Sequence, residues 1–356
     1  MYKRNFNWVI FSLIINVVIC SCVEKKKDIL SYEVNNISSY EATVVGADKQ
    51  VRSVNVPEYV RIGSNKYKVV SIGDSAFCNC SNLSEITLPN TIRTIGRYAF
   101  CGCVSLKEII IPESVHTINV GAFKNCKSLS SVNFNTDRLY LLGSGAFFNC
   151  TSLKSISIYE IVDEGIGSYA FKNCSSLVEV VCNVSNIQKY AFQNCNSLKN
   201  VRLYIYSGVI NEGLFQNCSS LEEFPHVGDI TKISSRSFEG CTSLTKIQIP
   251  SDVKEIENNA FLNCSNLEEV RLRGDQLYYR DAFIGCPKLK MNYKNLTTDN
   301  DWINWLRNTE FEYVDKSEKL KIRFPENFNM EYFFNISFYD TYKSETDYIS
   351  NLLMMR

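Results

Sequence analysis

The chain has 356 residues, and its 38 basic and 38 acidic side chains give a formal net charge of zero. Balanced charge argues against a nucleic-acid-binding protein, because such proteins carry an excess of Lys and Arg on one face. The 15 cysteines raise the question of a zinc site, but only two His and no CxxC pair are present, which argues against one.

The first 22 residues have the pattern of a signal peptide. Two basic residues precede an apolar run over residues 8–19, which is too short to span a bilayer. The run ends in Ile19-Cys20-Ser21-Cys22, which resembles the lipobox of bacterial lipoproteins. The resemblance implies cleavage before Cys22 and attachment of a diacylglycerol to its thiol. An ordinary secretory signal cleaved nearby is the alternative, and either would take the mature chain out of the cytoplasm.

Two short segments separate the signal from the main body of the chain. Residues 23–30 include three consecutive lysines and are predicted to be a solvated tether. Residues 31–68 are predicted to form a β-rich N-terminal cap, in which Tyr32 to Val45 make hairpin-like strands. Such a cap is needed because the first unit of a repeat array would otherwise expose its apolar end.

Residues 69–290 repeat one motif ten times at intervals of about 23 residues. Each copy has Phe, then Cys three residues later, then Leu after three more, and nine copies add an apolar residue after another three. The ten Phe residues are Phe77, Phe100, Phe123, Phe147, Phe171, Phe192, Phe215, Phe238, Phe261 and Phe283. A fixed period of this length predicts a solenoid, in which each repeat packs only on its neighbours.

The second repeat illustrates the structure expected for each unit. Leu106 to Ile111 has the form L-x-x-I-x-I, which predicts a strand that stops at Pro112 because proline cannot donate to a ladder. Ala precedes Phe in eight of the ten copies, which indicates a tight helical turn that aims Phe into the core. The residue before Cys is always Asn or Gly, so a residue with positive φ should close that turn.

The ten repeat cysteines are predicted to form columns of buried free thiols. In-register neighbours on parallel strands lie ~4.8 Å apart, whereas the Cβ atoms of a disulfide lie about 3.8 Å apart. Cys78 and Cys101 differ, because they come one residue after their Phe, at an offset that is polar in five of the other eight copies. This pair is a candidate disulfide in an oxidising compartment. Two free thiols are the alternative.

The motif I-G-x-x-A-F-x-x-C-x-x-L-x-x-I-x-I-P resembles the BspA-like, or treponemal-type, leucine-rich repeats, from about Val69 to Leu289. The resemblance implies a leucine-rich repeat solenoid with a parallel β-sheet on one face and short helical turns or loops on the other. It also implies an extracytoplasmic surface protein that engages other proteins, often in adhesion. The Gly and Pro of the motif are absent from several middle repeats, so a uniform binding surface is not expected.

The period stops after Leu289, and residues 291–356 are predicted to be a C-terminal cap or a small α+β appendage. Trp302 and Trp305 share a helical face, and residues 320–325 alternate like a strand. We expect these apolar residues to seal the last repeat. A separate binding module is the alternative.

The sequence contains no pattern that indicates catalysis. Its two His, His116 and His226, are far apart in the array, and no phosphate-binding loop or glycine fingerprint is present. We therefore predict a protein that is not an enzyme and that needs no cofactor or metal.

Variable side chains on the outer side of the strands are the candidates for partner binding. Tyr and Arg often anchor interfaces, and several fall at positions predicted to face solvent. The candidate residues are Tyr159, Arg202, Tyr204, Tyr206, Arg271 and Arg273. Scattered surface residues with no partner are the alternative.

The sequence thus predicts a surface protein, anchored by lipid to the outer membrane or cell surface, that binds a host matrix protein or a protein of another cell. Two rival hypotheses remain. In the first, Tyr159 and Tyr204 stack on sugar rings and the protein binds carbohydrate. In the second, the C-terminal appendage holds an enzyme site.

Overall fold

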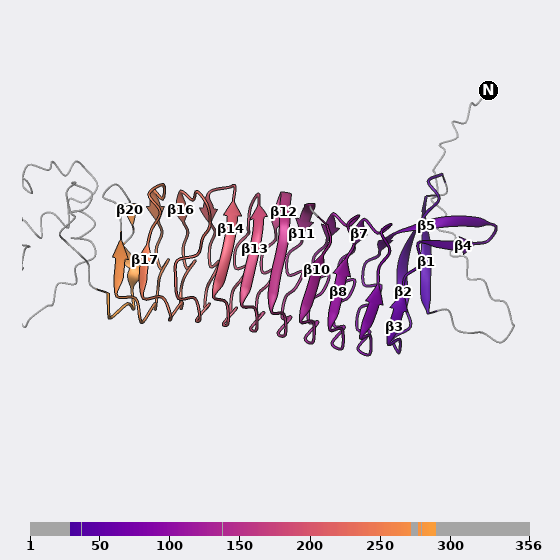
Figure 1. Cartoon of the computed structure of the whole chain (residues 1–356), viewed down its shortest axis with the longest axis horizontal. Helices are drawn as coiled ribbons and strands as arrows, with labels where there is room; N and C mark the ends of the chain where they lie inside the picture. The colour runs from indigo at the N-terminus through magenta and orange to yellow at the C-terminus, as the bar shows by residue number, and fades with distance from the viewer. Residues whose placement is uncertain (1–28, 37, 137, 272–276, 279, 290–356) are drawn as a thin grey trace, which may run out of the picture.

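A computed structural model describes residues 29–36, 38–136, 138–271, 277–278 and 280–289. These residues form a long rod of stacked coils, with the chain crossing the rod once on each side per repeat (Figure 1). The predicted signal peptide and the predicted C-terminal cap lie outside the described residues. The solenoid itself is confirmed.

The predicted L-x-x-I-x-I strands form one column along the rod. Its members are β3 (Ser53–Asn55), β6 (Glu85–Thr87), β8 (Glu108–Ile111), β10 (Ser131–Phe134), the first part of β12 (Ser155–Ile166), β13 (Glu179–Val184), β14 (Asn200–Ile205), β17 (Lys246–Gln248) and β19 (Glu269–Arg271). All their pairings are parallel. Buried and exposed residues alternate along β14, as expected for a strand with one face on the core.

A second column of strands lies just before the Phe of each repeat, and the sequence analysis did not predict it. Its members are β5 (Asn65–Ile72), β7 (Thr94–Ile95), β9 (Thr117–Ile118), β11 (Arg138–Leu142), the last part of β12, β15 (Val209–Ile210), β16 (Lys232–Ile233), β18 (Glu255–Ile256) and β20 (Leu277–Tyr278). Parallel pairing places the aliphatic residue of one repeat opposite that of the next, as with Ile72, Ile95 and Ile118. The single predicted sheet is thus joined by a second one.

Two antiparallel pairs stand at the N-terminal end of the rod. β1 (Leu30–Asn36) pairs with β2 (Glu41–Ala47), which covers the predicted hairpin, and β2 joins β5 in parallel. β4 (Tyr59–Ile62) pairs antiparallel with β5, and this hairpin extends away from the rod in Figure 1. β5 runs across residue 68, so the boundary between cap and solenoid stays a prediction.

The segment between the two columns is a series of hydrogen-bonded turns with two left-handed residues in each of the first nine repeats. The predicted one, before Cys, has φ near 60–70° throughout, as at Asn79 (59°) and Gly102 (73°). A second lies two residues before Phe, as at Tyr98 (53°) and Gly121 (63°). Sequence analysis missed it because this position carries Ser, Tyr, Gly, Arg or Asn. The only helix in the described residues is a 3-10 turn at Arg280–Phe283.

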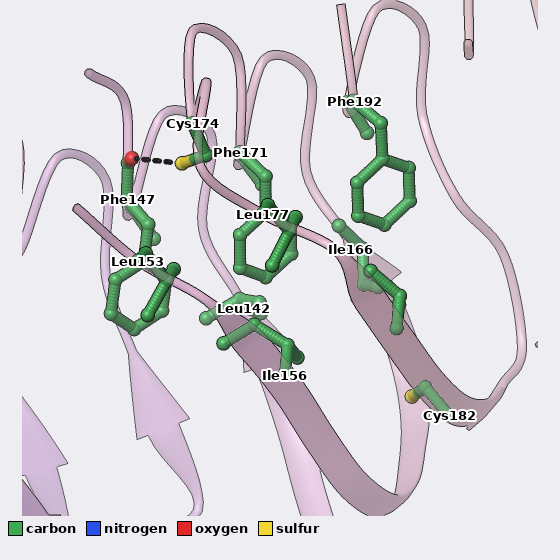
Figure 2. Packing of buried hydrophobic residues seen from close by; sticks show 14 of the residues in the cluster. Leu142, Phe147, Leu153, Ile156, Ile166, Phe171, Cys174, Leu177, Cys182 and Phe192 are labelled. Carbon is green, nitrogen blue, oxygen red and sulfur yellow. Dashed lines mark hydrogen bonds between the residues drawn. The ribbon is translucent and has the colours of Figure 1, made fainter. Parts of the chain in front are cut away.

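A continuous column of Phe rings forms the core. Consecutive rings from Phe77 to Phe283 have centroids 5.0–5.8 Å apart. The backbone holds this spacing, since the Phe77 N–H donates to the Ala99 carbonyl at 2.7 Å and later repeats copy the bond. A fully buried Phe side chain contributes roughly 3 kcal/mol, so the column is a major source of stability (Figure 2).

Nine of the ten repeat cysteines also bond to the column. From Cys103 onward, the thiol donates to the carbonyl of the Phe one repeat earlier, at 3.1–3.3 Å. Figure 2 shows this bond between Cys174 and Phe147. The same carbonyl accepts the N–H of the Cys in its own repeat, as Phe147 does from Cys150. Both lone pairs are therefore satisfied, which explains a small apolar donor at this position. Nine of the ten repeat cysteines are buried, as predicted.

Burial of these thiols predicts a loss of stability at high pH. Burial raises the pKa of Cys174 to about 12. This folded-state pKa lies above that of the unfolded chain. The contribution of the buried thiol to the free energy of unfolding is therefore complete below the unfolded pKa and is lost as the pH rises toward 12. Between about pH 8 and about pH 10 we expect the free energy of unfolding to fall by about 2 kcal/mol more for the wild type than for Cys174→Ala. Urea titrations measure this, and equal losses would contradict it.

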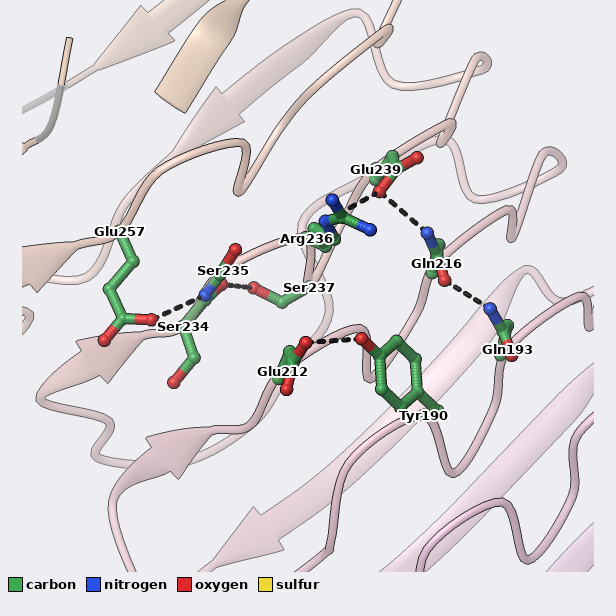
Figure 3. A network of polar contacts seen from close by, with 10 residues as sticks. All are labelled: Tyr190, Gln193, Glu212, Gln216, Ser234, Ser235, Arg236, Ser237, Glu239 and Glu257. Atoms are coloured by element: carbon green, nitrogen blue, oxygen red, sulfur yellow. Dashed lines mark hydrogen bonds and ion pairs between the residues drawn. The ribbon is translucent and has the colours of Figure 1, made fainter. Parts of the chain in front are cut away.

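The second left-handed position explains two glycines that lie two residues before Phe, at a variable position of the motif. The φ of Gly213 is 60°, and a Cβ added there would lie 2.2 Å from the Tyr190 ring. That ring stacks on Tyr169 at 5.4 Å, and its hydroxyl donates to Glu212 (Figure 3). Gly121 lies against Tyr98 in the same way, at 2.4 Å. After Tyr98 and Tyr190 the next repeat therefore leaves room for the ring with a glycine, whereas after Tyr169 it carries Tyr190, whose ring stacks on the first.

We expect Gly213→Ala to destabilise the protein by two separable effects. The left-handed backbone conformation costs about 1 kcal/mol for Ala, and the clash with the Tyr190 ring adds about 1–2 kcal/mol. In a Tyr190→Ala background only the backbone cost should remain. Urea unfolding of the four proteins in this double-mutant cycle separates the two effects. The same cost of Gly213→Ala in both backgrounds would show that the ring is not the obstacle.

Candidate interaction surface

The candidate surface is the solvent side of the column that contains β12, β13 and β14. Along these strands the inward residues are buried Ile, Leu, Val and Cys, and the outward residues vary from repeat to repeat. Because the inward side chains set the register, the outward ones project from a rigid frame. The structure gathers four of the six predicted partner-binding residues here.

Tyr159 projects from a β-bulge. Ile158 of β12 pairs with Cys182 of β13 and Glu160 pairs with Asn183, so Tyr159 is an extra residue without a partner. A bulge re-aims side chains, and both Tyr159 and Glu160 point away from the core. Glu160 is held by Arg138 at 3.4 Å. Tyr159 is left 73% exposed.

Arg202 and Tyr204 face outward from β14, two strands from the bulge. Tyr204 pairs with Asn183, which pairs with Glu160, so about 10 Å of sheet separates Tyr204 from the bulge. Tyr204 is 48% exposed. Tyr206, just past the end of the strand, is 64% exposed. The predicted residues on β12 and β14 thus share one area.

His226 joins this area, and sequence analysis missed it. Pro225 interrupts the strand of the seventh repeat, which keeps only a bridge between Arg202 and His226. The His226 ring meets the edge of Tyr204 at a centroid distance of 5.4 Å, and its Nε2 lies 3.2 Å from the tyrosine hydroxyl. The residue does not fit the alternation counted from Leu, because Pro225 shifts the phase. We call Tyr159, Arg202, Tyr204, Tyr206 and His226 the central patch.

The other predicted residues lie elsewhere. Arg271 is on β19, three repeats further along the rod, where Glu269 binds it at 2.8 Å and also approaches Lys246 at 3.8 Å. It is therefore a charge-paired residue outside the central patch. Arg273 and the proposed lipidation residue Cys22 lie outside the described residues.

A second exposed aromatic pair occupies the other column. Tyr140 of β11 is 45% exposed and stacks on His116, with centroids 5.3 Å apart. His116 and His226 therefore each contact a different tyrosine. In the part of the chain that the structure describes, no three His, Cys, Asp or Glu side chains gather to hold a metal ion. Nor does any described helix have the length and apolar surface needed to cross a membrane.

Comparison with solved structures finds other bacterial leucine-rich repeat proteins. One from Bacteroides ovatus is 26% identical, over 75% of this chain and 94% of that one, with a TM-score of 0.33. The leucine-rich repeat protein of T. pallidum is 22% identical, over 75% and 91%, with a TM-score of 0.33. A leucine-rich cell surface protein of Faecalibacterium prausnitzii is 22% identical, over 71% and 95%, with a TM-score of 0.31. Comparison with curated proteins gave no match.

A family model covers most of the described rod. The model for the BspA type leucine rich repeat region matches residues 62–178 and 164–290. These stretches include every Phe-Cys-Leu motif and together exceed half of the chain. The chain belongs to the BspA-type leucine-rich repeat family.

Proposed function

We propose that the chain is an extracytoplasmic surface protein that binds a protein partner through the central patch and catalyses no reaction. The family supports a role in protein interaction, and the N-terminal sequence pattern supports export. One observation carries the proposal: the bulge and the Pro225 interruption collect three exposed tyrosines, an arginine and a histidine on one face.

The frame beneath the patch favours tight binding. Ile158 and Leu203, which flank Tyr159 and Tyr204, are buried in the core, so the tyrosines have little backbone freedom to lose. Association then costs less entropy than it would from a mobile loop. Tyr offers a large contact area with a polar tip, and the Arg202 guanidinium can bind carboxylates or backbone carbonyls. A protein surface supplies both kinds of contact.

The patch can be tested with a panel of extracellular matrix and bacterial surface proteins. We expect a panel protein to bind the chain from Val23 onward, and the double variant Arg202→Ala/Tyr204→Ala to raise its Kd at least about tenfold, or about 1.4 kcal/mol. Tyr59→Ala, which removes an exposed tyrosine from β4 at the N-terminal end of the rod, is the matched control and should leave Kd unchanged. Biolayer interferometry measures both.

Two results would count against this proposal. A double variant that binds the partner as tightly as the wild type would place the interface elsewhere. A glycan array that shows binding lost on Tyr159→Ala, with no protein bound, would favour the carbohydrate rival, in which the tyrosine rings stack on sugars.

We further propose that a lipid on Cys22 holds the mature chain at the membrane. Each buried CH₂ of an acyl chain contributes ~0.8 kcal/mol, so two or three chains give a stable anchor. In bacteria fed a labelled fatty acid, we expect the wild type to carry the label and to enter the detergent phase. Cys22→Ser should lose both properties and Cys20→Ser should keep them. Label retained on Cys22→Ser would exclude Cys22 as the anchor.

A further inference from the structure

One row of side chains runs along the rod beside the Phe column, and we call it the flanking row. Its members come one residue after each Phe, on the turns. They are Cys78, Cys101, Lys124, Phe148, Lys172, Gln193, Gln216, Glu239, Leu262 and Ile284. The repeat cysteines are not in it.

Neighbours in the flanking row touch across the coils. The Lys124 ammonium lies 5.1 Å from the ring centroid of Phe148. The Gln193 amide donates to Gln216, whose own amide donates to Glu239 at 2.7 Å (Figure 3). A side chain at this offset therefore reaches its counterpart one coil further on.

Cys78 and Cys101 are the first two members of the flanking row. The backbone holds their coils in register on both sides: the Phe77 N–H donates to Ala99 and the Asn79 N–H donates to Cys101, each at 2.7 Å. In-register neighbours lie ~4.8 Å apart, inside the Cα range of about 4.4–6.8 Å for a disulfide. The Cβ atoms need a shift of about 1 Å to reach bonding distance, which a turn accommodates more easily than a strand in mid-sheet.

Chemical environment separates this pair from the buried cysteines, and also from half-buried Cys286, whose thiol donates to the Phe261 carbonyl. Both thiols are free and half-buried, so a reagent can reach them. Burial raises the pKa of Cys101, and the nearby Cys78 thiol raises it further, which fits two thiols in contact. Cys103, two residues on, is buried and donates its thiol to the Phe77 carbonyl.

We propose that Cys78 and Cys101 form a disulfide that joins the first two coils when the chain meets an oxidising compartment. Each thiol loses its proton and an S–S bond forms. The two electrons and two protons pass to an oxidised disulfide, either small-molecule or that of a thiol–disulfide oxidoreductase, which becomes two thiols. The bond closes a loop at the N-terminal end of the array, where a coil has fewer full repeats to hold it. This proposal rests on the proposed export at one point only, which is that export brings the chain into an oxidising compartment.

The test uses the mature chain with Cys22→Ser, which removes the N-terminal thiol. The protein is equilibrated with mixtures of reduced and oxidised glutathione, quenched in acid, unfolded and alkylated with N-ethylmaleimide. We expect the oxidised protein to carry two fewer alkyl groups, a linked peptide pair containing Cys78 and Cys101, and full alkylation after dithiothreitol. Cys182→Ser, at a buried position in β13, should keep the link, and Cys78→Ser or Cys101→Ser should abolish it.

Three results would overturn the proposal. They are full alkylation of both residues at every glutathione ratio, a link that joins Cys78 to Cys80 or to a buried repeat cysteine, and a covalent dimer on a non-reducing gel that Cys78→Ser removes. The purified protein is tested without a partner or membrane, so failure here leaves the proposed function untouched. Failure of partner binding likewise leaves the disulfide in place.

Discussion

Every coil of this protein depends on one constraint, which is that neighbouring coils stay in register. Equivalent residues of successive repeats must lie opposite each other along the rod. Phe rings can stack at 5.0–5.8 Å only if the chain returns to the same register after each turn. Backbone bonds such as that from Phe77 to Ala99 hold the register at the turns, and the two columns of parallel strands hold it on either side. Because these bonds run between coils, no single coil is stable alone, and the rod is held by its neighbours throughout.

The repeat cysteine depends on the same register, because its thiol donates to a carbonyl of the preceding coil. The site is fully buried in the core, and it faces a Phe carbonyl that has one lone pair left to satisfy. A thiol is small and apolar and still donates a bond, as Cys174 does to Phe147. Burial raises the pKa of the Cys150 and Cys195 thiols well above the usual value, so these thiols stay protonated and unreactive. The repeat cysteines are therefore explained by packing in the core. Cys78 and Cys101 are half-buried, so a reagent can reach their thiols.

The exposed side chains that distinguish one part of the rod from another gather where the repeat becomes irregular. The inward positions cannot vary without breaking the columns, so differences between repeats appear on the outward side of the strands. An extra residue in β12 creates the bulge that exposes Tyr159, and Pro225 breaks the next part of the column and turns His226 toward Tyr204. These two departures lie on either side of β13 and β14, and the predicted Arg202 and Tyr204 lie between them. The central patch is thus formed where an extra residue in β12 and the break at Pro225 disturb an otherwise regular solenoid.

The amino-acid sequence was enough to predict the period, the buried Phe, Cys and Leu positions and the left-handed residue before Cys, because those residues recur at one spacing and each has a clear packing reason. It also identified Tyr159, Arg202 and Tyr204 as outward-facing, because alternation along a strand is local. The folded structure was needed to find the second strand column, whose members are as short as two residues, and the second left-handed position, where Tyr98 and Gly121 look unrelated until one lies over the other. It also separated Arg271 from the central patch and brought His226 in. Contacts between coils set these features, and such contacts join residues about 23 positions apart.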